Sequence, residues 1–427
     1  MTISRPSSAN WAEHLMMTPF SELSLPIRVA ELEIAGGIPD LHRCHGYGGV
    51  YLLLRRNGYP LGTVRLPVSE DTVHAEAIQA AMRRKLLREN KWAVLMDDHA
   101  TSSRHSPGIS VVVCTRDRPR LLERCLRSLA QLQYPAYEVI VVDNASISEA
   151  TRQLARKAEV RYVREERPGL DWARNCGYKA ARYDIVAYTD DDTEVDPKWL
   201  GAIGAAFEDA SVRAVTGLVL AAVMDTEAEL LFEFCYGGMG KGTIASEFDP
   251  ASLSAWKRIG AHHVGVGANM AFRRELLHEL GGFDTALDVG TPSHGGGDLD
   301  IFHRSLMAGA VIRYQPAALV RHHHRRDLPG LRRQLTDNGR AFGVYLLTIF
   351  KRGTIPRHTT VWYSIRVWLG WMIGRIVKGF LGRERLPLPF LLAELWGAAQ
   401  SPLFFFATFR EDRRRRGLYS TPPRGSD

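Results

Sequence analysis

From Gly108 onward the chain alternates short β-branched runs with amphipathic segments, and this order restricts the possible fold more than any other feature. The expected strands are Ile109–Cys114, Val139–Val142, Val160–Val163 and Ile185–Tyr188. The expected helices are Arg120–Leu132, Glu149–Lys157 and Leu170–Ala181. Short runs rich in Val and Ile are typical of buried strands. Repeated strand-helix-strand units predict an α/β fold with a mostly parallel sheet, flanked by helices.

Two of these strands end in acidic residues. Asp190-Asp191-Asp192 follows the strand Ile185–Tyr188, and Asp143 follows Val139–Val142. The carboxyl ends of parallel strands meet at one edge of a sheet, which is where open α/β sheets bind ligands. Three adjacent carboxylates repel one another unless a cation offsets them, and carboxylate oxygens suit Mg²⁺ or Mn²⁺. A solvated acidic turn is the alternative for an isolated run, and the second acidic strand end favours a ligand site.

The chain divides into three predicted regions. Residues 1–107 are expected to form a small α+β accessory module, in which Asn57-Gly58 joins two strands as a hairpin turn. A polar segment, Asp97–Pro107, has the composition of a linker. Residues 108–330 are the expected α/β domain, and residues 331–427 are an expected helical, basic tail.

Composition excludes several classes of protein. With 427 residues, 45% of them hydrophobic and 24% charged, the chain has ordinary globular values. Its net charge of +8 fits a phosphate-bearing substrate or an anionic membrane surface. We do not expect nucleic acid as a partner, because no recognition motif accompanies the charge. The five cysteines are scattered and form no C-x-x-C pair, so neither a disulfide framework nor a zinc site is expected, and reduced thiols indicate the cytoplasm.

The tail has the pattern of a helix at a membrane surface. Val361–Phe380 mixes Trp, Ile, Val and Leu with basic residues. Arg413–Arg416 adds a polybasic run that anionic lipids would attract. Leu386–Phe409 is apolar but interrupted by prolines, so it does not read as one spanning helix. A core helix pair with a solvated charged end is the alternative. The expected location is the cytoplasm, with peripheral attachment to the inner face of the cell membrane left open.

A set of motifs in this order resembles the family-2 inverting glycosyltransferases with the GT-A fold. The motifs are Ile109–Pro119, Val141–Ser146, Ala173–Gly177, Thr189–Asp192, Gly265–Arg274, Gly281–Asp284, Gly297–Asp300 and Val320–His324. Each motif alone is weak evidence, whereas the ordered set is specific, and it covers roughly residues 108 to 326. The resemblance implies a hexosyltransferase that uses a nucleotide-diphosphate sugar, with UDP as the expected nucleotide, together with Mn²⁺ or Mg²⁺.

The resemblance also implies roles for individual residues on the donor side. The residues expected to contact the nucleotide sugar are Thr115, Arg116, Asp143, Arg174, Asp190 and Asp191. Arg116 stands where the family more often has an aromatic residue. The residues expected to hold the metal are Asp190, Asp192, His322 and His324, and the choice between the two histidines stays open. A surface role for the histidines is the alternative.

Inverting transfer needs a base on the acceptor hydroxyl, and the resemblance places Asp298 there. The family's usual Glu beside this position is replaced by Gly297. Asp300 is expected to begin and cap the following helix.

Two other functions were weighed against sugar transfer. A nucleotidyltransferase would carry a Gly-rich loop after the first strand, and Cys114–Arg120 contains no glycine. A non-catalytic nucleotide-sugar-binding protein of the same fold would be expected to lose carboxylates that are present here. The expected acceptor is a glycan or a lipid-linked molecule, as in the synthesis of a cell-envelope polysaccharide. The segment Met224–His263, which should line the acceptor side, has no readable pattern.

Overall fold

The computed structural model describes residues 24–68, 70–89 and 106–420. The chain forms two compact units, and each is described by itself. One unit combines Met1–Ala100 with Val223–Gly237, and the other contains Thr101–Ala222 and Gly238–Asp427. The return of Val223–Gly237 to the N-terminal unit had no signal in the sequence. Most of the predicted linker, up to residue 105, lies outside the described residues.

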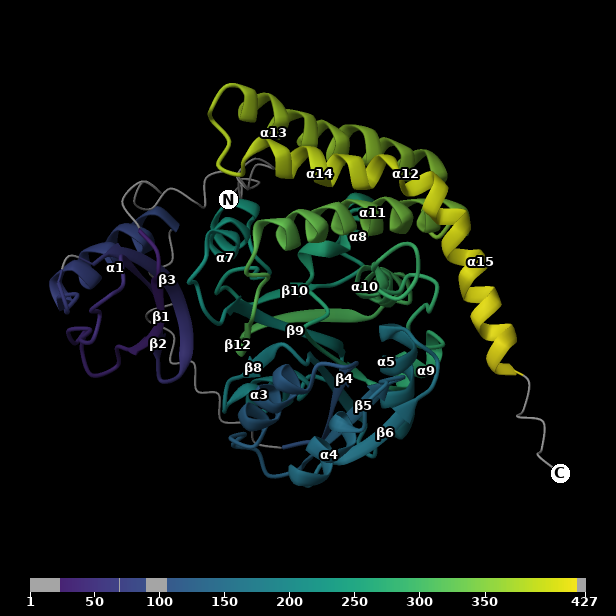
Figure 1. Cartoon of the computed structure of the whole chain (residues 1–427), viewed down its shortest axis with the longest axis horizontal. Helices are drawn as coiled ribbons and strands as arrows, with labels where there is room; N and C mark the ends of the chain where they lie inside the picture. Colours follow the sequence, from purple (N-terminus) through teal and green to yellow (C-terminus); the bar gives the residue numbers. More distant parts are fainter. Residues whose placement is uncertain (1–23, 69, 90–105, 421–427) are drawn as a thin grey trace, which may run out of the picture. The chain divides into compact units, whose positions relative to one another are not determined.

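The N-terminal unit is a three-stranded sheet with helices (Figure 1). Its elements are β1 (Ile27–Glu33), β2 (Gly49–Arg56), β3 (Tyr59–Pro67), α1 (Ala75–Glu89), α7 (Glu227–Leu230) and η3 (Leu231–Tyr236). β2 and β3 pair antiparallel, which confirms the predicted hairpin. Asn57 and Gly58 both have positive φ, as the tight turn between right-twisted strands requires.

The larger unit is built on a sheet of nine strands. They are β4 (Ile109–Thr115), β5 (Tyr137–Asn144), β6 (Arg161–Glu165), β7 (Ile185–Asp190), β8 (Thr193–Val195), β9 (Val212–Ala221), β10 (Ser246–Phe248), β11 (Asn269–Arg273) and β12 (Val311–His322). The order is β10-β12-β9-β11-β7-β4-β5-β6, with β8 paired to β12. The neighbours β7, β4, β5 and β6 are parallel, as the strand-helix-strand repeats predicted.

Beyond β7 the sheet is mixed. β11 runs antiparallel to both β7 and β9, whereas β12 runs parallel to β9. The α/β prediction is confirmed. The antiparallel strands β10 and β11 lie in the part of the chain for which the sequence pattern gave no strand order.

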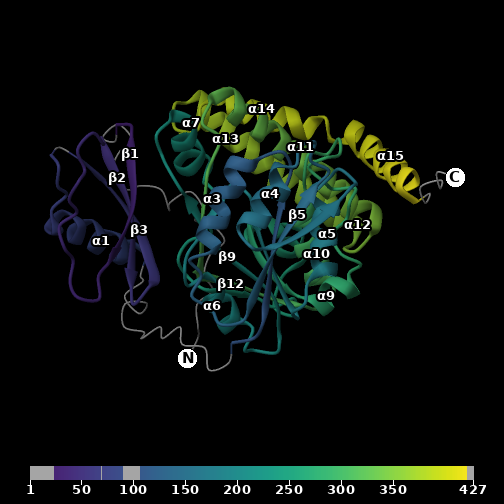
Figure 2. The same cartoon turned by 60° about the horizontal axis from the view of Figure 1, so that its bottom comes forward.

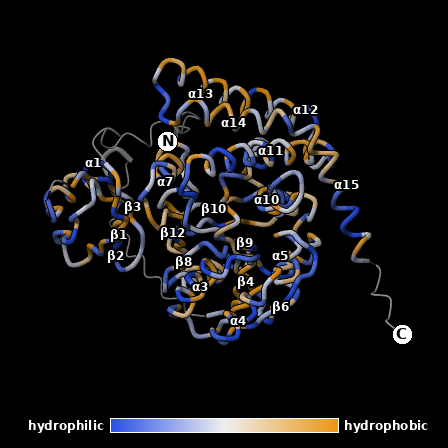
Figure 3. Tube along the Cα trace, viewed as in Figure 1, coloured by the Kyte–Doolittle hydropathy of each residue, from blue (hydrophilic) through white to orange (hydrophobic). Residues whose placement is uncertain are grey.

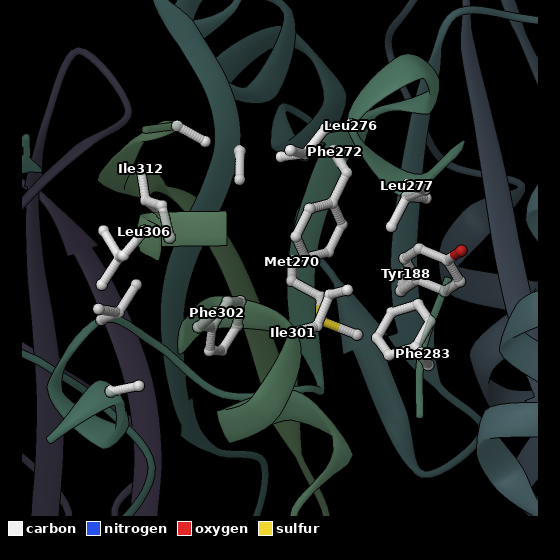
Figure 4. Packing of buried hydrophobic residues seen from close by; sticks show 14 of the residues in the cluster. Tyr188, Met270, Phe272, Leu276, Leu277, Phe283, Ile301, Phe302, Leu306 and Ile312 are labelled. Carbon is white, nitrogen blue, oxygen red and sulfur yellow. The ribbon is translucent and has the colours of Figure 1, made fainter. Parts of the chain in front are cut away.

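Helices cover both faces of this sheet (Figures 1 and 2). Those before the tail are α3 (Pro119–Leu129), α4 (Ala150–Lys157), α5 (Leu170–Ala180), α6 (Trp199–Ala206), α8 (Ala255–Ile259), η4 (Ala261–His263), α9 (Arg274–Glu279) and α10 (Gly297–Met307). The core packs strand side chains against α9 and α10 (Figure 4). Tyr188 of β7 meets Phe283 edge to face at 5.4 Å, and Phe272 of β11 stacks on Phe302 of α10. This packing joins β7, β11 and α10 in one hydrophobic core.

The predicted helical tail is confirmed. It contains α11 (Leu328–Arg352), α12 (Arg357–Trp362), η5 (Tyr363–Leu369), α13 (Gly370–Phe380), α14 (Leu388–Ala399) and α15 (Ser401–Ser420). α11 begins where the Asp327 side chain accepts a hydrogen bond from the Gly330 amide at 2.7 Å. It then packs closely on α14, since a Cβ at Gly339 would lie 2.0 Å from the Glu394 carbonyl oxygen. Within the described part of the chain, no single helix has the length and apolar character to cross a membrane, although α14 and α15 together, bent by 55°, meet that test.

Candidate functional site

The three consecutive aspartates lie at the carboxyl end of β7, where the chain turns into β8. β8 pairs with β12 and sets Thr193 opposite His322. One donor atom from each of Asp190, Asp192 and His322 lies within 4.8 Å of the others. His322 Nε2 is 3.2 Å from Asp192 Oδ1. Two strand ends far apart in sequence therefore bring two carboxylates and an imidazole into one group.

The histidines alternate in direction, as successive side chains of extended backbone do. His323 points away and contacts Glu194 at 2.6 Å. His324 stacks on His322 with ring centroids 5.1 Å apart. Among the described residues, His322 lies in the group with Asp190 and Asp192 that could hold a metal ion, and His324 does not. The geometry therefore favours His322 of the two predicted ligands.

The charges of this group fit a cation. Burial raises the pKa of Asp190, because the ionised form loses solvation. For Asp192, burial would also raise the pKa, but the charge and hydrogen bond of His322 outweigh it and lower the pKa to about 2. The Nδ1 atom of His322 is buried and has no hydrogen-bond partner among the described residues. Carboxylates suit Mn²⁺ and Mg²⁺, and an imidazole ligand favours Mn²⁺ of the two.

Thr115 and Asp191, which are both predicted to contact the nucleotide, form a hydrogen bond with each other. The Thr115 hydroxyl, at the end of β4, donates to Asp191 at 2.7 Å. Asp191 is buried, and burial together with the charge of Asp192 raises its pKa to about 6. Arg118 donates to Asp191 at 3.1 Å and to Asp192 at 3.4 Å. Arg118 was missed by the sequence analysis, although it follows the strand end directly. Arg116 is exposed at the same strand end.

Asp143 lies one strand away. It is the register partner of Thr115 across β4 and β5. Its carboxylate is buried and accepts hydrogen bonds from Tyr162 at 2.7 Å and Arg164 at 3.1 Å. Asp143 thus stands at the same edge of the sheet as the β7 aspartates, with Tyr162 and Arg164 as the groups that hold it.

Arg174 and Asp298 lie on the other side of Asp190. Arg174 is buried, with Nη2 3.8 Å from Asp190 Oδ1. Asp298 is half-buried in the first turn of α10, where its Oδ2 accepts a hydrogen bond from the Gly267 amide at 3.0 Å. A Cβ at Gly267 would lie 2.7 Å from Arg174 Nη2 and 3.3 Å from Asp298 Cβ. Gly267 is therefore the point at which the arginine and the predicted base meet.

The prediction that Asp300 begins and caps the helix is wrong. α10 begins at Gly297, after Gly295 and Gly296 with positive φ, so Asp300 lies within its first turns. Asp300 is fully buried, 2.6 Å from Arg304 Nε, and also contacts Arg352. Because α10 starts at Gly297 and not at Asp300, Asp300 lies inside the helix and faces the core. Asp298 lies at the N-terminal end of the helix.

The unreadable segment before His263 supplies two residues near the predicted base. Lys241 is half-buried, and burial lowers its pKa although the charge of Asp298 opposes this. The His262 side chain is exposed to solvent, but the loss of hydration from the protein atoms around it, together with the charge of Lys241, lowers its pKa to about 3. Glu229 and Glu233 of the same segment are buried in the N-terminal unit, where Glu229 closes a capping box with Thr226.

Part of the chain matches a known protein family. Residues 110–281 match the family described as Glycosyl transferase family 2. The chain is 27% identical over 223 residues to a pre-mycofactocin glycosyltransferase of Mycobacterium tuberculosis, which covers 52% of this chain and 43% of that protein. It is 29% identical over 221 residues to the succinoglycan biosynthesis protein ExoM of Rhizobium meliloti, covering 50% and 65%. The matches thus span less than two thirds of these relatives' own lengths.

A solved structure is also similar. The mannosyltransferase PcManGT from Pyrobaculum calidifontis, in complex with GDP-Man and Mn²⁺, aligns with a TM-score of 0.45 and 20% identity. The alignment covers 81% of this chain and 90% of that one.

Proposed function

We propose that the protein transfers a sugar from a nucleotide-diphosphate sugar to an acceptor hydroxyl, since residues 110–281 match the glycosyltransferase family 2. The observation that carries this proposal is the convergence of Asp190, Asp192 and His322 beside Arg174 and Asp298. A transferase of this kind needs a cation for the diphosphate and a base for the acceptor hydroxyl. The residues that could hold the cation lie on one side of Asp190, and the predicted base, Asp298, lies on the other.

On the donor side, Asp190, Asp192 and His322 would hold Mn²⁺ or Mg²⁺. When bound, the ion would neutralise the charge that develops on the departing diphosphate. Arg118, which already contacts Asp191 and Asp192, adds a partly exposed cation at the same edge. Thr115, Arg116 and Asp143 surround the ends of β4 and β5, where we place the nucleotide, with UDP as the proposed donor nucleotide.

On the acceptor side, Asp298 would take the proton from the attacking hydroxyl. Its two carboxylate oxygens accept hydrogen bonds from the amides of Gly267, at 3.0 Å, and Leu299, at 2.9 Å. These bonds fix the carboxylate while leaving it partly open to solvent. A base on the face opposite the leaving diphosphate gives inversion at the sugar carbon.

A donor screen tests the proposal. Purified protein with Mn²⁺ or Mg²⁺ is offered UDP-, GDP- and dTDP-linked sugars, and release of the nucleoside diphosphate is measured. We expect release with one nucleotide class, stimulated by the metal and abolished by chelation. Absence of release and of metal-dependent binding across the whole panel would contradict the function.

The tail carries an exposed apolar surface that fits a membrane. We call Trp362, Ile365, Trp371, Ile373, Val377 and Phe380 the apolar tail face; their exposed fractions run from 49% to 73%. Orange, apolar residues predominate along α13 in Figure 3. Arg366 and Lys378 are exposed between them, and residues 361–381 contain no acidic side chain. Aromatic residues and cations on one helical surface are typical of attachment to anionic lipids.

The polybasic run offers less free charge than the sequence indicated. Arg415 donates to the Pro168 carbonyl at 2.6 Å, and Arg416 donates to the Thr285 hydroxyl at 2.7 Å. Both arginines therefore hold α15 against the rest of the larger unit. We propose peripheral attachment to the inner membrane face through the apolar tail face, with a glycan or lipid-linked molecule as the acceptor.

Liposome sedimentation tests this attachment. The protein should co-sediment with anionic vesicles, and Trp362→Glu combined with Trp371→Glu should move most of it to the supernatant, because both side chains are about half exposed and each charge opposes insertion. Ile147→Glu, at a 93% exposed position on the loop before α4, is the matched control. Equal sedimentation of the tail variant and the control would contradict the proposal. Truncation near residue 356 is a poorer test, since α14 packs on α11.

A further inference from the structure

Asp171 is a buried carboxylate in the first turn of α5 that lies next to the site without belonging to the predicted set. It is 1% exposed. Its Oδ1 accepts a hydrogen bond from Arg174 Nη1 at 3.0 Å. Its Oδ2 is buried and has no hydrogen-bond partner among the described residues. Leaving a buried polar atom unpaired is unfavourable, so a carboxylate kept in this state calls for a reason.

The unpaired oxygen occupies the space beside Gly297. A Cβ built on Gly297 would lie 1.9 Å from Asp171 Oδ2 and 2.7 Å from its Cγ. Gly297 is the first residue of α10 and does not have a positive φ, so its backbone accepts any L-residue. The described neighbour that demands glycine there is the carboxylate of Asp171. A carboxylate from α5 thus takes the place that a side chain at position 297 would fill, one residue before Asp298.

Through Arg174, Asp171 reaches both halves of the site. Arg174 Nη2 is 3.8 Å from Asp190 Oδ1 and would be 2.7 Å from a Cβ built on Gly267, whose amide holds Asp298. The Phe283 ring closes a further side, 5.4 Å from the guanidinium carbon. A buried cation beside a metal-binding carboxylate competes with the metal for that carboxylate. A second carboxylate on the cation offsets this competition and fixes the direction of the guanidinium.

We propose that Asp171 is a positioning residue for sugar transfer, which holds Arg174 between Asp190 and Gly267, and that position 297 is glycine because this carboxylate needs the space. The inference rests on the proposed function. It assigns to α5 the carboxylate that the resemblance leads one to expect on α10. Asp171 touches neither the donor nor the acceptor in this scheme and acts through Arg174.

The test compares Asp171→Ala, Gly297→Ala and the double variants Asp171→Ala/Gly297→Ala and Asp171→Ala/Gly297→Glu. The readouts are melting temperature, calorimetric affinity for nucleoside diphosphate with and without Mn²⁺, and kcat and KM. We expect Asp171→Ala to weaken the metal-dependent affinity by roughly 10- to 100-fold, the usual cost of removing a supporting partner behind a metal site. Gly297→Ala should lower the melting temperature, because its methyl group collides with the carboxylate.

The two double variants separate space from charge. Asp171→Ala/Gly297→Ala should recover the melting temperature lost by Gly297→Ala but not the affinity, because the collision is relieved while the charge stays absent. Asp171→Ala/Gly297→Glu should recover affinity and kcat, because it returns a carboxylate from the other helix. Wild-type affinity in Asp171→Ala, or no better affinity with Glu than with Ala at position 297, would overturn the inference. If the wild-type protein itself showed no metal-dependent binding, the proposed function would fall first, and this inference with it.

Discussion

Replacing Asp298 by Asn should lower the rate of sugar transfer by about 10²–10⁴-fold, the contribution of a well-placed base, while donor affinity stays near the wild-type value. Asn keeps the shape of the side chain and can still accept from the Gly267 amide, but it cannot take a proton from the acceptor hydroxyl. Because Asp298 is not part of the group formed by Asp190, Asp192 and His322, metal-dependent nucleotide binding should persist. The measurement is kcat with the donor found in the screen, beside calorimetric nucleotide affinity.

A matched control exists on the neighbouring helix. Asp337 of α11 contacts His294 and Arg340 at the surface, and Asp337→Asn should leave turnover unchanged. Asp300→Asn is a poor control, because Asp300 is fully buried and its ion pair with the partly buried Arg304 would be broken, and breaking a buried pair costs roughly 3–5 kcal/mol. If Asp298→Asn turned over at the wild-type rate, another group would be the base.

Replacing Asp190 or Asp192 by Ala should remove the metal-dependent part of nucleotide binding. Each change leaves two of the three ligand atoms and also upsets the charges around them, since His322 is held by Asp192 and Arg174 faces Asp190. Calorimetric titration of UDP and GDP, with and without Mn²⁺, measures the effect. Glu194→Gln is the control, because Glu194 follows the same turn but pairs with His323 outside the group. An unchanged difference between the two titrations in the Asp variants would refute the site.

The same binding should weaken as the pH falls. A metal ligand must be deprotonated, so each proton that Asp190 or His322 takes up competes with the ion. Burial raises the pKa of Asp190. Burial would lower the pKa of His322, but the charge of Asp192 prevails and raises it. Both groups therefore take up protons at a higher pH than they would in water. As the pH is lowered, metal-dependent affinity should begin to decrease at a pH higher than the one at which a free imidazole titrates. The calorimetric titration repeated across pH values checks this.

The local sequence pattern was enough to predict the strands in the first half of the larger unit. Runs of Val and Ile indicated β4, β5 and β7 to within about two residues of their observed ends, because a buried strand is defined by its own side chains. The acids that follow β5 and β7 were predicted to share one sheet edge, and parallel pairing through β4 places them there. A fold of alternating strands and helices leaves few other arrangements.

The second half depended on contacts between distant segments. The antiparallel direction of β11 followed from packing, and the sequence offered no turn signal that would set it. The distinction between His322 and His324 required the pairing of β12 with β8, which brings one imidazole to Asp192. The inward turn of Asp300 followed from the positive φ of two glycines that precede α10.

The sequence alone therefore determined the α/β class, the strand ends that carry carboxylates and the resemblance to a transferase family, because these depend on residue type and short-range order. Tertiary structure decided which of those side chains meet. In the sequence, Gly297 is a position without a side chain. In the fold, the carboxylate of Asp171, 126 positions earlier in the chain, occupies the space where a side chain at position 297 would lie. The fold also gives Arg415 and Arg416 hydrogen-bond partners at Pro168 and Thr285, far away in the sequence. Such pairings depend on the approach of elements remote in sequence, and no local pattern of residues encodes them.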